Sequence, residues 1–316
     1  MIRNLAAALA LWAAFGAAQA QTYPAGPINL VIPLAAGDAT DTAGRAIAEE
    51  VARDLKVAVV PVNRPGAAGS LGADIVVKAP KDGHTLLLAN NASLVFRAVI
   101  DPKATSYDAF RDLTPLALAM RSPSVLVVNA GLPYRTLKDM VAHAKNAPVR
   151  IGTAGIGSVG HFCVNTIATL TKTELTMVPF TGAMPAVTAV RGGHIEGVVL
   201  ALGAMAGHLK SGAVRGMAIS TKTPEFPDIP TLAELGYSEP LFDVWTAFFA
   251  PAGISPEVTR VLVAALERAI RAPAVAARLQ PLGILPAYAP PAELVAAMRE
   301  EHRRVSALAR QAGIVK

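Results

Sequence analysis

Two short glycine-containing turns, each between a hydrophobic strand and a helix, carry the chemistry that this sequence suggests first. The earlier turn covers residues 35–40 after an apolar segment at 28–34, and we expect a helix that Asp41 opens. The later turn covers residues 154–158 after a second apolar segment and leads into a helix from about residue 159. Backbone N–H groups at the start of a helix have no partner within the helix and lie at its positive end. Such turns are therefore suited to binding anions.

Two such turns, one in each half of the chain, predict a cleft whose lobes grip one small organic anion. The contacts that we expect from the turns and from the end of a nearby strand are Ala35, Ala36, Gly37, Asp38, Thr40, Asn90, Asn91, Ala154, Gly155, Gly157, Ser158 and His161. Asp41 we expect mainly to cap its helix. The alternative is that the glycines only permit the chain to reverse. His161 either donates a hydrogen bond to the anion or is a partly buried structural imidazole.

Residues 1–20 have the pattern of a secretory signal peptide. Arg3 precedes an apolar stretch at 5–18, and Ala18-Gln19-Ala20 matches an A-x-A cleavage site. The apolar stretch is short for a bilayer span, which disfavours the alternative of a retained membrane anchor. We therefore expect a protein that is exported to the periplasm, cleaved near Ala20 and soluble there.

The composition argues against several classes of function. The chain of 316 residues has a net charge of +6, but aromatic residues are only 5% of it, and acidic residues interrupt the basic cluster at 299–304. We interpret that segment as a solvated helix face, because nucleic-acid binding needs clustered basic residues with stacking aromatics. The six histidines and the single cysteine show no spacing of metal ligands, so we expect no metal site. Cys163 cannot form a disulfide within the chain, and we interpret it as a buried small hydrophobic residue.

After residue 27 the pattern alternates between strands and helices. The predicted strands cover 28–34, 58–62, 84–89, 124–129, 149–153, 175–180, 195–200, 214–220 and 244–250. The predicted helices cover 41–54, 69–78, 136–146, 159–171, 183–192, 204–211, 255–271, 273–281 and 291–312. Most strands are apolar on both faces, which indicates parallel strands covered by helices. The sequence therefore predicts an α/β fold with open, mostly parallel sheets whose ligands lie beyond the carboxyl ends of the strands.

Two breaks divide this pattern into lobes. One lies at residues 120–123, and the other is the proline-rich stretch 221–240. If the chain crosses between lobes at both places, residues 21–122 and 244–316 form one lobe and residues 123–243 form the other. A lobe interrupted by a second lobe is the arrangement of hinged binding proteins, in which closure traps the ligand.

Short motifs along essentially the whole mature chain resemble one known family. They are, in order, Tyr23-Pro24, Pro27-Ile28, Pro33 with Gly37, Thr40, Asp41 and Arg45, Asn63-Arg64-Pro65-Gly66-Ala67, Asp82-Gly83-His84-Thr85-Leu86-Leu87, Ala154-Gly155 with Gly157-Ser158 and His161, Val178-Pro179-Phe180 with Gly182 and Pro185-Ala186, Gly192-Gly193, Pro227-Asp228-Ile229-Pro230-Thr231, and Phe249-Ala250-Pro251-Ala252-Gly253. Each motif is weak alone, but their number and order are specific. The chain resembles the Bug, or TctC-type, extracytoplasmic solute-binding receptors of tripartite tricarboxylate transporters.

The resemblance implies a two-lobed periplasmic binding protein of the Venus-flytrap, type II-like fold. It implies a receptor rather than an enzyme, without a cofactor, that passes its ligand to membrane permease subunits. Ligands in this family are mostly small carboxylates, held by backbone amides, hydroxyls and bridging water. We expect a monomer. The rival within this fold is a ligand-sensing input to a two-component signalling system.

The chain departs from the family at several cleft positions. Gly37-Asp38-Ala39 stands where the family usually has a run of glycines. Asp38 either turns outward to solvent or meets a cationic group of the ligand, such as an amino acid, an amine or an aza-aromatic acid. Phe180-Thr181 and Ala201-Leu202 replace more polar pairs, and we add Phe180, Thr181 and Ala201 to the expected contacts. These changes predict a ligand less polar than citrate, with Phe180 as an apolar wall, or a diverged relative that binds weakly.

The second turn also fits a different class of protein. Residues 155–160 match G-x-G-x-x-G, which is the fingerprint of dinucleotide binding. The acidic residue that should contact the ribose belongs at the end of the next strand, whereas Glu174 lies at that strand's start. Ser158 lacks the G-x-S-x-G nucleophile elbow because residue 156 is isoleucine. An enzyme that binds a cofactor is therefore a minor alternative.

Overall fold

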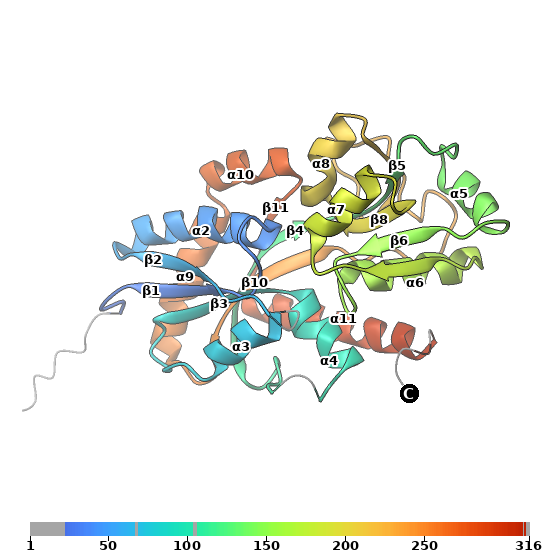
Figure 1. Ribbon diagram of the computed structural model, residues 1–316. Helices are drawn as coiled ribbons and strands as arrows, with labels where there is room; N and C mark the ends of the chain where they lie inside the picture. The colour runs from blue at the N-terminus through green and yellow to red at the C-terminus, as the bar shows by residue number, and fades with distance from the viewer. Residues whose placement is uncertain (1–22, 67–68, 104–105, 312, 314–316) are drawn as a thin grey trace, which may run out of the picture.

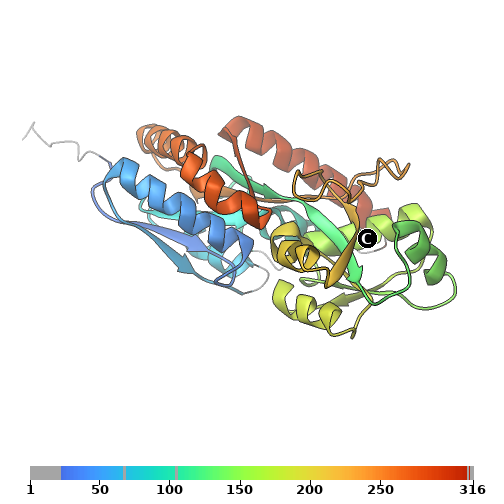
Figure 2. The same cartoon turned by 90° about the horizontal axis from the view of Figure 1, so that it is seen from above.

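Two sheets, each flanked by helices, give the molecule its two lobes (Figures 1 and 2). The computed structural model describes residues 23–66, 69–103, 106–311 and 313. The predicted signal peptide lies outside these residues. Within them, no helix combines the length and the apolar composition that a membrane crossing needs. The predicted two-lobed α/β fold is confirmed.

The first sheet has six strands in the order β11-β4-β10-β3-β1-β2. These strands are β1 (Ile28–Ile32), β2 (Val59–Asn63), β3 (Thr85–Asn90), β4 (Leu113–Ser122), β10 (Val244–Pro251) and β11 (Leu285–Ala289). Successive side chains of a strand point to opposite faces. Leu86 and Leu88 accordingly pack with α2 (Ala39–Leu55), α9 (Pro256–Ile270) and α10 (Pro273–Leu279). Leu87 and Ala89 pack on the other face with α3 (Ser70–Val77) and α11 (Pro291–Gln311).

The second sheet has five strands in the order β7-β6-β8-β5-β9. These strands are β5 (Ser124–Asn129), β6 (Arg150–Thr153), β7 (Thr176–Pro179), β8 (Gly197–Ala201) and β9 (Val214–Ile219). Val198 and Leu200 pack with α7 (Ala183–Arg191) and α8 (Leu202–Lys210). Val199 packs on the opposite face, in the cluster that includes α5 (Leu137–Ala144) and α6 (Val159–Thr171).

Both sheets are mixed, which corrects the expectation of mostly parallel sheets. β10 runs antiparallel to β3 and β4, and β5 runs antiparallel to β8 and β9. The reason is the path of the chain between lobes. β4 leads out of the first lobe and β10 leads back into it, so the two strands run in opposite directions. Apolar runs alone do not reveal this, because buried antiparallel strands are as apolar as parallel ones.

Three segments were not predicted as regular structure. β4 contains Pro115, which lies where the pairing with β10 shifts register; such irregularities admit a proline within a sheet. β11 is short and lies at the edge of the sheet beside β4. A single π-type turn, η2 (Ala92–Phe96), continues into the short helix α4 (Arg97–Ile100) and has too few residues to show helical periodicity.

One apolar cluster extends across both lobes, beside a separate cluster in each lobe. Only Pro123 separates the end of β4 from the start of β5. The ring of Phe96 packs edge-on against Phe162 at 4.9 Å and against Phe242 at 5.3 Å between ring centroids, which joins η2 to α6 and to the segment before β10. Helix α11 contacts β4 and α4 as well as α6, and it runs beneath both lobes in Figure 1. The lobes are therefore held together by packed side chains as well as by the crossing strands.

Candidate functional site

The strand ends that carry both turns face the boundary between the lobes. In the first sheet, Ser122, at the crossover, pairs with Val244 at the start of β10, and the last residue of β3, Asn90, pairs with Thr246. β1 is parallel to β3, so both strands end at the crossover edge. In the second sheet, Ser124 pairs with Ala201 at the end of β8. β6 and β7 run parallel to β8, so they also end at this boundary.

Each turn comes close to the opposite lobe. A Cβ atom built on Gly203, near the start of α8, would lie 3.7 Å from the Cβ of Ala39 at the start of α2. A Cβ atom built on Gly157 would lie 3.2 Å from Cδ1 of Ile100, at the end of α4. The starts of α2, α6 and α8 therefore lie at one shared boundary, as the two-turn interpretation requires.

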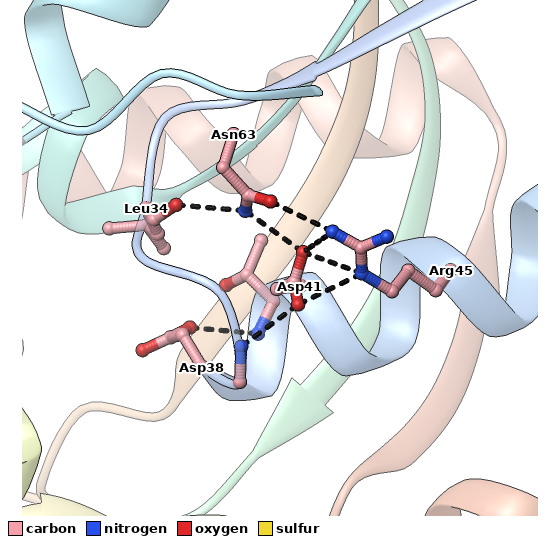
Figure 3. Close-up of polar contacts among 7 residues, drawn as sticks. Leu34, Asp38, Asp41, Arg45 and Asn63 are labelled. Carbon is pink, nitrogen blue, oxygen red and sulfur yellow. Dashed lines mark hydrogen bonds and ion pairs between the residues drawn. The ribbon is translucent and has the colours of Figure 1, made fainter. Parts of the chain in front are cut away.

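Helix α2 begins earlier than expected and is capped by a different aspartate (Figure 3). Its first residue is Ala39, and its N-cap is Asp38, whose Oδ1 accepts a hydrogen bond from the backbone N–H of Thr40 at 2.8 Å. The expectation that Asp41 opens and caps the helix is therefore wrong. The cause is Gly37, whose φ of +84° reverses the chain early and leaves Asp38 in the extended conformation of an N-cap.

Asp41 instead forms a buried polar cluster that holds the turn to the rest of the lobe (Figure 3). Its Oδ2 accepts from the backbone N–H of Gly37 at 2.9 Å, and both oxygens accept from Nε of Arg45 at 3.0 and 3.1 Å. Nδ2 of Asn63 donates to Oδ1 of Asp41 at 2.9 Å and to the carbonyl oxygen of Leu34 at 3.0 Å. Burial would raise the pKa of Asp41, but the hydrogen bonds from Arg45, Gly37 and Asn63 hold it below its usual value.

The first turn consequently carries an acidic side chain, and some of its backbone N–H groups already have hydrogen-bond acceptors within the protein. Asp38 is only partly exposed, and crowding by surrounding protein raises the pKa of its carboxyl, with a smaller contribution from the charge of Asp41. Thr40 is buried and its hydroxyl lies 3.2 Å from that of Thr246, so it serves the interior of the lobe. Among the described residues, the backbone N–H groups of Ala35 and Ala36 have no hydrogen-bond partner.

The second turn uses neutral groups. Ser158 is the N-cap of α6, and its hydroxyl accepts from the backbone N–H of His161 at 3.3 Å. Nδ1 of His161 accepts from the backbone N–H of Gly157 at 3.2 Å, so this imidazole is neutral and carries its proton on Nε2. Burial lowers the pKa of His161, in agreement with that bond. His161 is thus a structural imidazole that ties the turn to its helix, with Nε2–H as its remaining donor.

The glycines of the second turn are explained by backbone geometry. Gly155 and Gly157 have φ values of +129° and +83°. A Cβ atom built on Gly160 would lie 2.4 Å from the carbonyl oxygen of Val199, because α6 packs directly on β8. The G-x-G-x-x-G spacing therefore meets the needs of a strand, a tight turn and a closely packed helix.

The second lobe has backbone N–H donors at its helix starts that are not next to an acidic side chain. Neither α6 nor α7 has an acidic residue in its first turn, and α7 has no side-chain cap at Gly182. In the described part of the chain, the backbone N–H groups of Val159, Thr181 and Ala183 form no hydrogen bond within the protein. Two large apolar side chains next to these groups are exposed: Ile156 by 57% and Met184 by 64%.

The remaining predicted contacts take different places. Ala154 and Thr181 are exposed in their turns. The ring of Phe180 is half-buried and packs with the core beneath α7, with Cε2 3.0 Å from a Cβ atom built on Gly152. Ala201 precedes α8, and the first N–H groups of that helix already donate to the crossover, from Leu202 to the carbonyl oxygen of Pro123 at 2.7 Å and from Gly203 to Oγ of Ser122 at 3.4 Å.

Asn90 and Asn91 hold the structure near the crossover. Oδ1 of Asn90 accepts from the backbone N–H of Ser93 at 3.2 Å and so supports η2. Asn91 is fully buried, and its Nδ2 donates to the carbonyl oxygen of Asp243 at 2.9 Å and to Glu301 at 3.0 Å. Because its side chain has no exposed surface, a ligand cannot reach Asn91 in this conformation.

Sequence reasoning missed a polar cluster at the crossover. Glu301, assigned to a solvated helix face, instead accepts from Asn91 and, at 2.7 Å, from Nε1 of Trp245. Burial raises the pKa of Glu301 to about 7, although these hydrogen bonds and the charges of Arg121 and Arg304 oppose the shift. A basic segment with interspersed acids gives no signal for this, because α11 becomes buried only where it meets both lobes.

The structure also places the residues that were considered for metal, thiol and cofactor chemistry. The described residues contain no cluster of potential metal ligands. Cys163 is buried and its pKa is raised to about 12 by burial, so it behaves as the predicted small hydrophobic residue. Glu174 is exposed and lies before β7 begins, at the opposite end of the parallel strands β6 and β7 from the turn.

Comparison with known proteins gives consistent results over almost the whole chain. The sequence model of the family described as "Tripartite tricarboxylate transporter family receptor" matches residues 43–314. The chain is similar to the protein BugT of Bordetella pertussis, with 31% identity over 298 residues, 93% of this chain and 91% of BugT.

Solved structures agree with the sequence comparison. MatC from Rhodopseudomonas palustris, solved with bound malate, has a TM-score of 0.81 and 30% identity, covering 90% of this chain and 99% of MatC. The R. palustris protein Rpa4515, solved with adipate, has a TM-score of 0.83 and 27% identity, covering 92% of this chain and 98% of that protein.

Proposed function

Since the chain belongs to the receptor family of tripartite tricarboxylate transporters, we propose that it is a periplasmic receptor that captures a small carboxylate-containing solute and delivers it to membrane permease subunits. The observation that carries the proposal is the set of partnerless N–H groups at the starts of α6 and α7, which follow the parallel strands β6 and β7 at the edge of the sheet that faces the first lobe. Anions bind well at such helix starts, where unpaired donors and the helix dipole act together. Its structural relatives MatC and Rpa4515 hold malate and adipate, both of which are carboxylates.

Lobe closure is the proposed means of capture. We place residues 21–122 and 244–316 in one lobe and 123–243 in the other, with the hinge at Pro123 and just before β10. Rotation about these two crossing segments would change the distance of α2 from α6 and α7 while each sheet stays intact. Closure would also take water away from the ligand's carboxylate, which strengthens its hydrogen bonds to the backbone.

The proposed ligand has an apolar part beside its carboxylate. Ile156 and Met184 are exposed next to the partnerless N–H groups, and large exposed apolar side chains at a site favour apolar contacts. The proposed contacts in the second lobe are Ala154, Gly155, Ile156, Gly157, Ser158, Phe180, Thr181 and Met184, with His161 offering Nε2–H. In the first lobe they are Ala35, Ala36, Gly37 and Asp38.

A thermal-shift screen of the mature protein against aliphatic and aromatic carboxylates tests the proposal, with calorimetry on the compounds that bind. Ligand at saturation should reduce the radius of gyration in solution scattering. An unchanged radius would contradict closure, and the absence of any binding carboxylate would contradict the receptor function.

One variant tests the helix start directly. Ala183 is the first residue of α7, a position that accepts proline, so Ala183→Pro removes one N–H group without breaking the helix. The dissociation constant should rise about tenfold, because a hydrogen bond to a charged group is worth roughly 1.5–3 kcal/mol. The matched control Ala183→Ser keeps the N–H group and should bind normally. Equal affinity for both variants would remove α7 from the site.

A further inference from the structure

The two lobes present opposite electrostatic character at their shared boundary. The second lobe contributes helix starts with neutral caps, an uncapped Gly182 and no acidic residue in the first turns of α6 and α7. The first lobe contributes the carboxylate of Asp38 at the start of α2. Among the described residues, no Lys, Arg or His forms an ion pair with Asp38, and Thr40 alone donates a hydrogen bond to it.

Asp41, the other acid of this turn, is not available as a second unpaired carboxyl group. Asp41 is nearly covered, with 4% of its side chain exposed, and its charge is paired with Arg45 at 3.0 Å. Asn63 and the N–H of Gly37 occupy its remaining lone pairs. Asp38 is therefore the acid of this turn that has no cationic partner among the described residues, and its carboxyl oxygens still have lone pairs available.

We propose that Asp38 determines specificity by binding a cationic group of the ligand, so that the solute is bipolar, with a carboxylate at the starts of α6 and α7 and a protonated nitrogen at Asp38. This inference rests on the proposed function, because it assigns the substrate class of the same cleft. The ligand spans the lobe boundary, and its two ends match the two lobes in charge.

The surroundings of Asp38 support this assignment. A carboxylate from the ligand placed at the first turn would lie beside the carboxyl group of Asp38, and the N–H groups of Gly37 and Thr40 are already bonded to Asp41 and Asp38. Crowding by protein raises the pKa of Asp38, and a cation beside it would restore the ionised form. The opposite lobe is within reach, since Ala39 lies against Gly203.

The test compares pairs of compounds that differ only in the amino group. Calorimetry on the mature protein would measure L-glutamate against glutarate, 4-aminobutyrate against butyrate, and 3-(aminomethyl)benzoate against 3-methylbenzoate. Wild-type protein should bind the amino member of at least one pair about tenfold more tightly, as expected for a charge-assisted hydrogen bond to a half-buried carboxylate.

Asp38→Asn is the decisive variant, because asparagine caps a helix as well as aspartate but carries no charge. It should abolish the preference for the amino member while leaving the unfolding midpoint close to that of wild type. Asp228→Asn removes the same charge from an exposed loop and should leave the preference unchanged.

The outcomes separate this inference from the receptor function. If wild type binds the compounds without an amino group and rejects their amino partners, or if Asp38→Asn keeps the same preference, the inference is overturned and the receptor function stands. If wild type binds no member of any pair and no carboxylate in the thermal-shift screen, both are overturned.

Discussion

The two strand-turn-helix units follow one backbone plan but differ in the charges they hold. Both have a glycine at positive φ just before an N-cap residue, in Gly37-Asp38 and in Gly157-Ser158. In the first lobe the N-cap is an aspartate, and the ion pair between the buried Asp41 and the partly exposed Arg45 fixes the turn. In the second lobe the hydroxyl of Ser158 and the neutral imidazole of His161 fix the turn instead.

This difference shows that a helix start is an anion site only while its donors stay available. Two negative charges about 4 Å apart repel by roughly 4 kcal/mol at an effective dielectric constant near 20. The first turn has placed its own carboxylate where an anion would lie, so the second turn is the better anion site. Variants that act on one unit at a time can sharpen or contradict this contrast.

The largest effect is expected from Asp41→Ala in the first lobe. It leaves Arg45, Asn63 and the N–H of Gly37 without their shared acceptor. Breaking a buried ion pair costs 3–5 kcal/mol, and we expect about 3 kcal/mol because Arg45 is partly exposed. Urea unfolding monitored by circular dichroism would measure the free energy of unfolding. A loss below about 1 kcal/mol would show that the cluster does not fix the turn.

Gly160→Ala should have the next largest effect, in the second lobe. Its Cβ would lie 2.4 Å from the carbonyl oxygen of Val199, and backbone cannot move aside as a side chain does. We expect a loss of about 2 kcal/mol, within the usual cost of overpacking. The matched variant is Gly44→Ala in α2, whose Cβ would meet the tip of Leu88 at 2.6 Å. It should cost less, since the tip of a side chain can move whereas a backbone carbonyl cannot, and the gain in helix propensity from alanine is the same in both helices. If Gly160→Ala and Gly44→Ala had the same unfolding midpoint, the expected difference between crowding against backbone and crowding against a side chain would be contradicted.

Ser158→Ala should cost about 1 kcal/mol, which is typical for the loss of an N-cap. The hydroxyl accepts a single bond from the backbone of His161, whereas Asp41 accepts from three residues. The comparison of Ser158→Ala with Asp41→Ala in the same urea titration measures how differently the two turns are fixed. A cost for Ser158→Ala that matched the cost for Asp41→Ala would remove the contrast.

The smallest effect at neutral pH concerns His161 and emerges only in acid. Burial holds its pKa below the ordinary value of 6.5, so the unfolded chain takes up a proton where the folded imidazole stays neutral. The free energy of unfolding should therefore fall as the pH drops below 6.5 towards the pKa of the folded protein. Above pH 6.5 the contribution of His161 should be fully present. Unfolding midpoints across pH 4–8 would show a weaker acid dependence for His161→Asn than for wild type. An exposed control, His194→Asn, should follow wild type.

Much of the fold was predictable because local patterns fix local elements. Helix α6 spans residues 159–171 and strand β5 spans residues 124–129, as predicted, since the turn and its N-cap mark the start of the helix and a continuous apolar run marks the strand. Strands β4 and β11 were missed, because Pro115 reads as a break and β11 gains its pairing from β4, distant in sequence. The glycine turns were located correctly, but the capping of α2 by Asp38 rather than Asp41 depended on the backbone angle at Gly37.

The candidate site divides in the same way. Its position at the strand ends followed from the order of strands, turns and helices. The burial of Asn91 and Glu301 did not, because both are polar residues whose partners come from three separate segments of the chain.

The sequence by itself determined the two turns, the order of the elements and the resemblance to a receptor family, since these depend on residues close together in the chain. Tertiary structure alone decided which backbone donors remain available and which charges are paired. The N–H of Gly37 is bonded to Asp41 and Asp41 is paired with Arg45, whereas the carboxyl group of Asp38 has no cationic partner among the described residues at the lobe boundary. The physical reason is that burial and pairing depend on groups brought together from distant segments, and a linear pattern does not contain those distances.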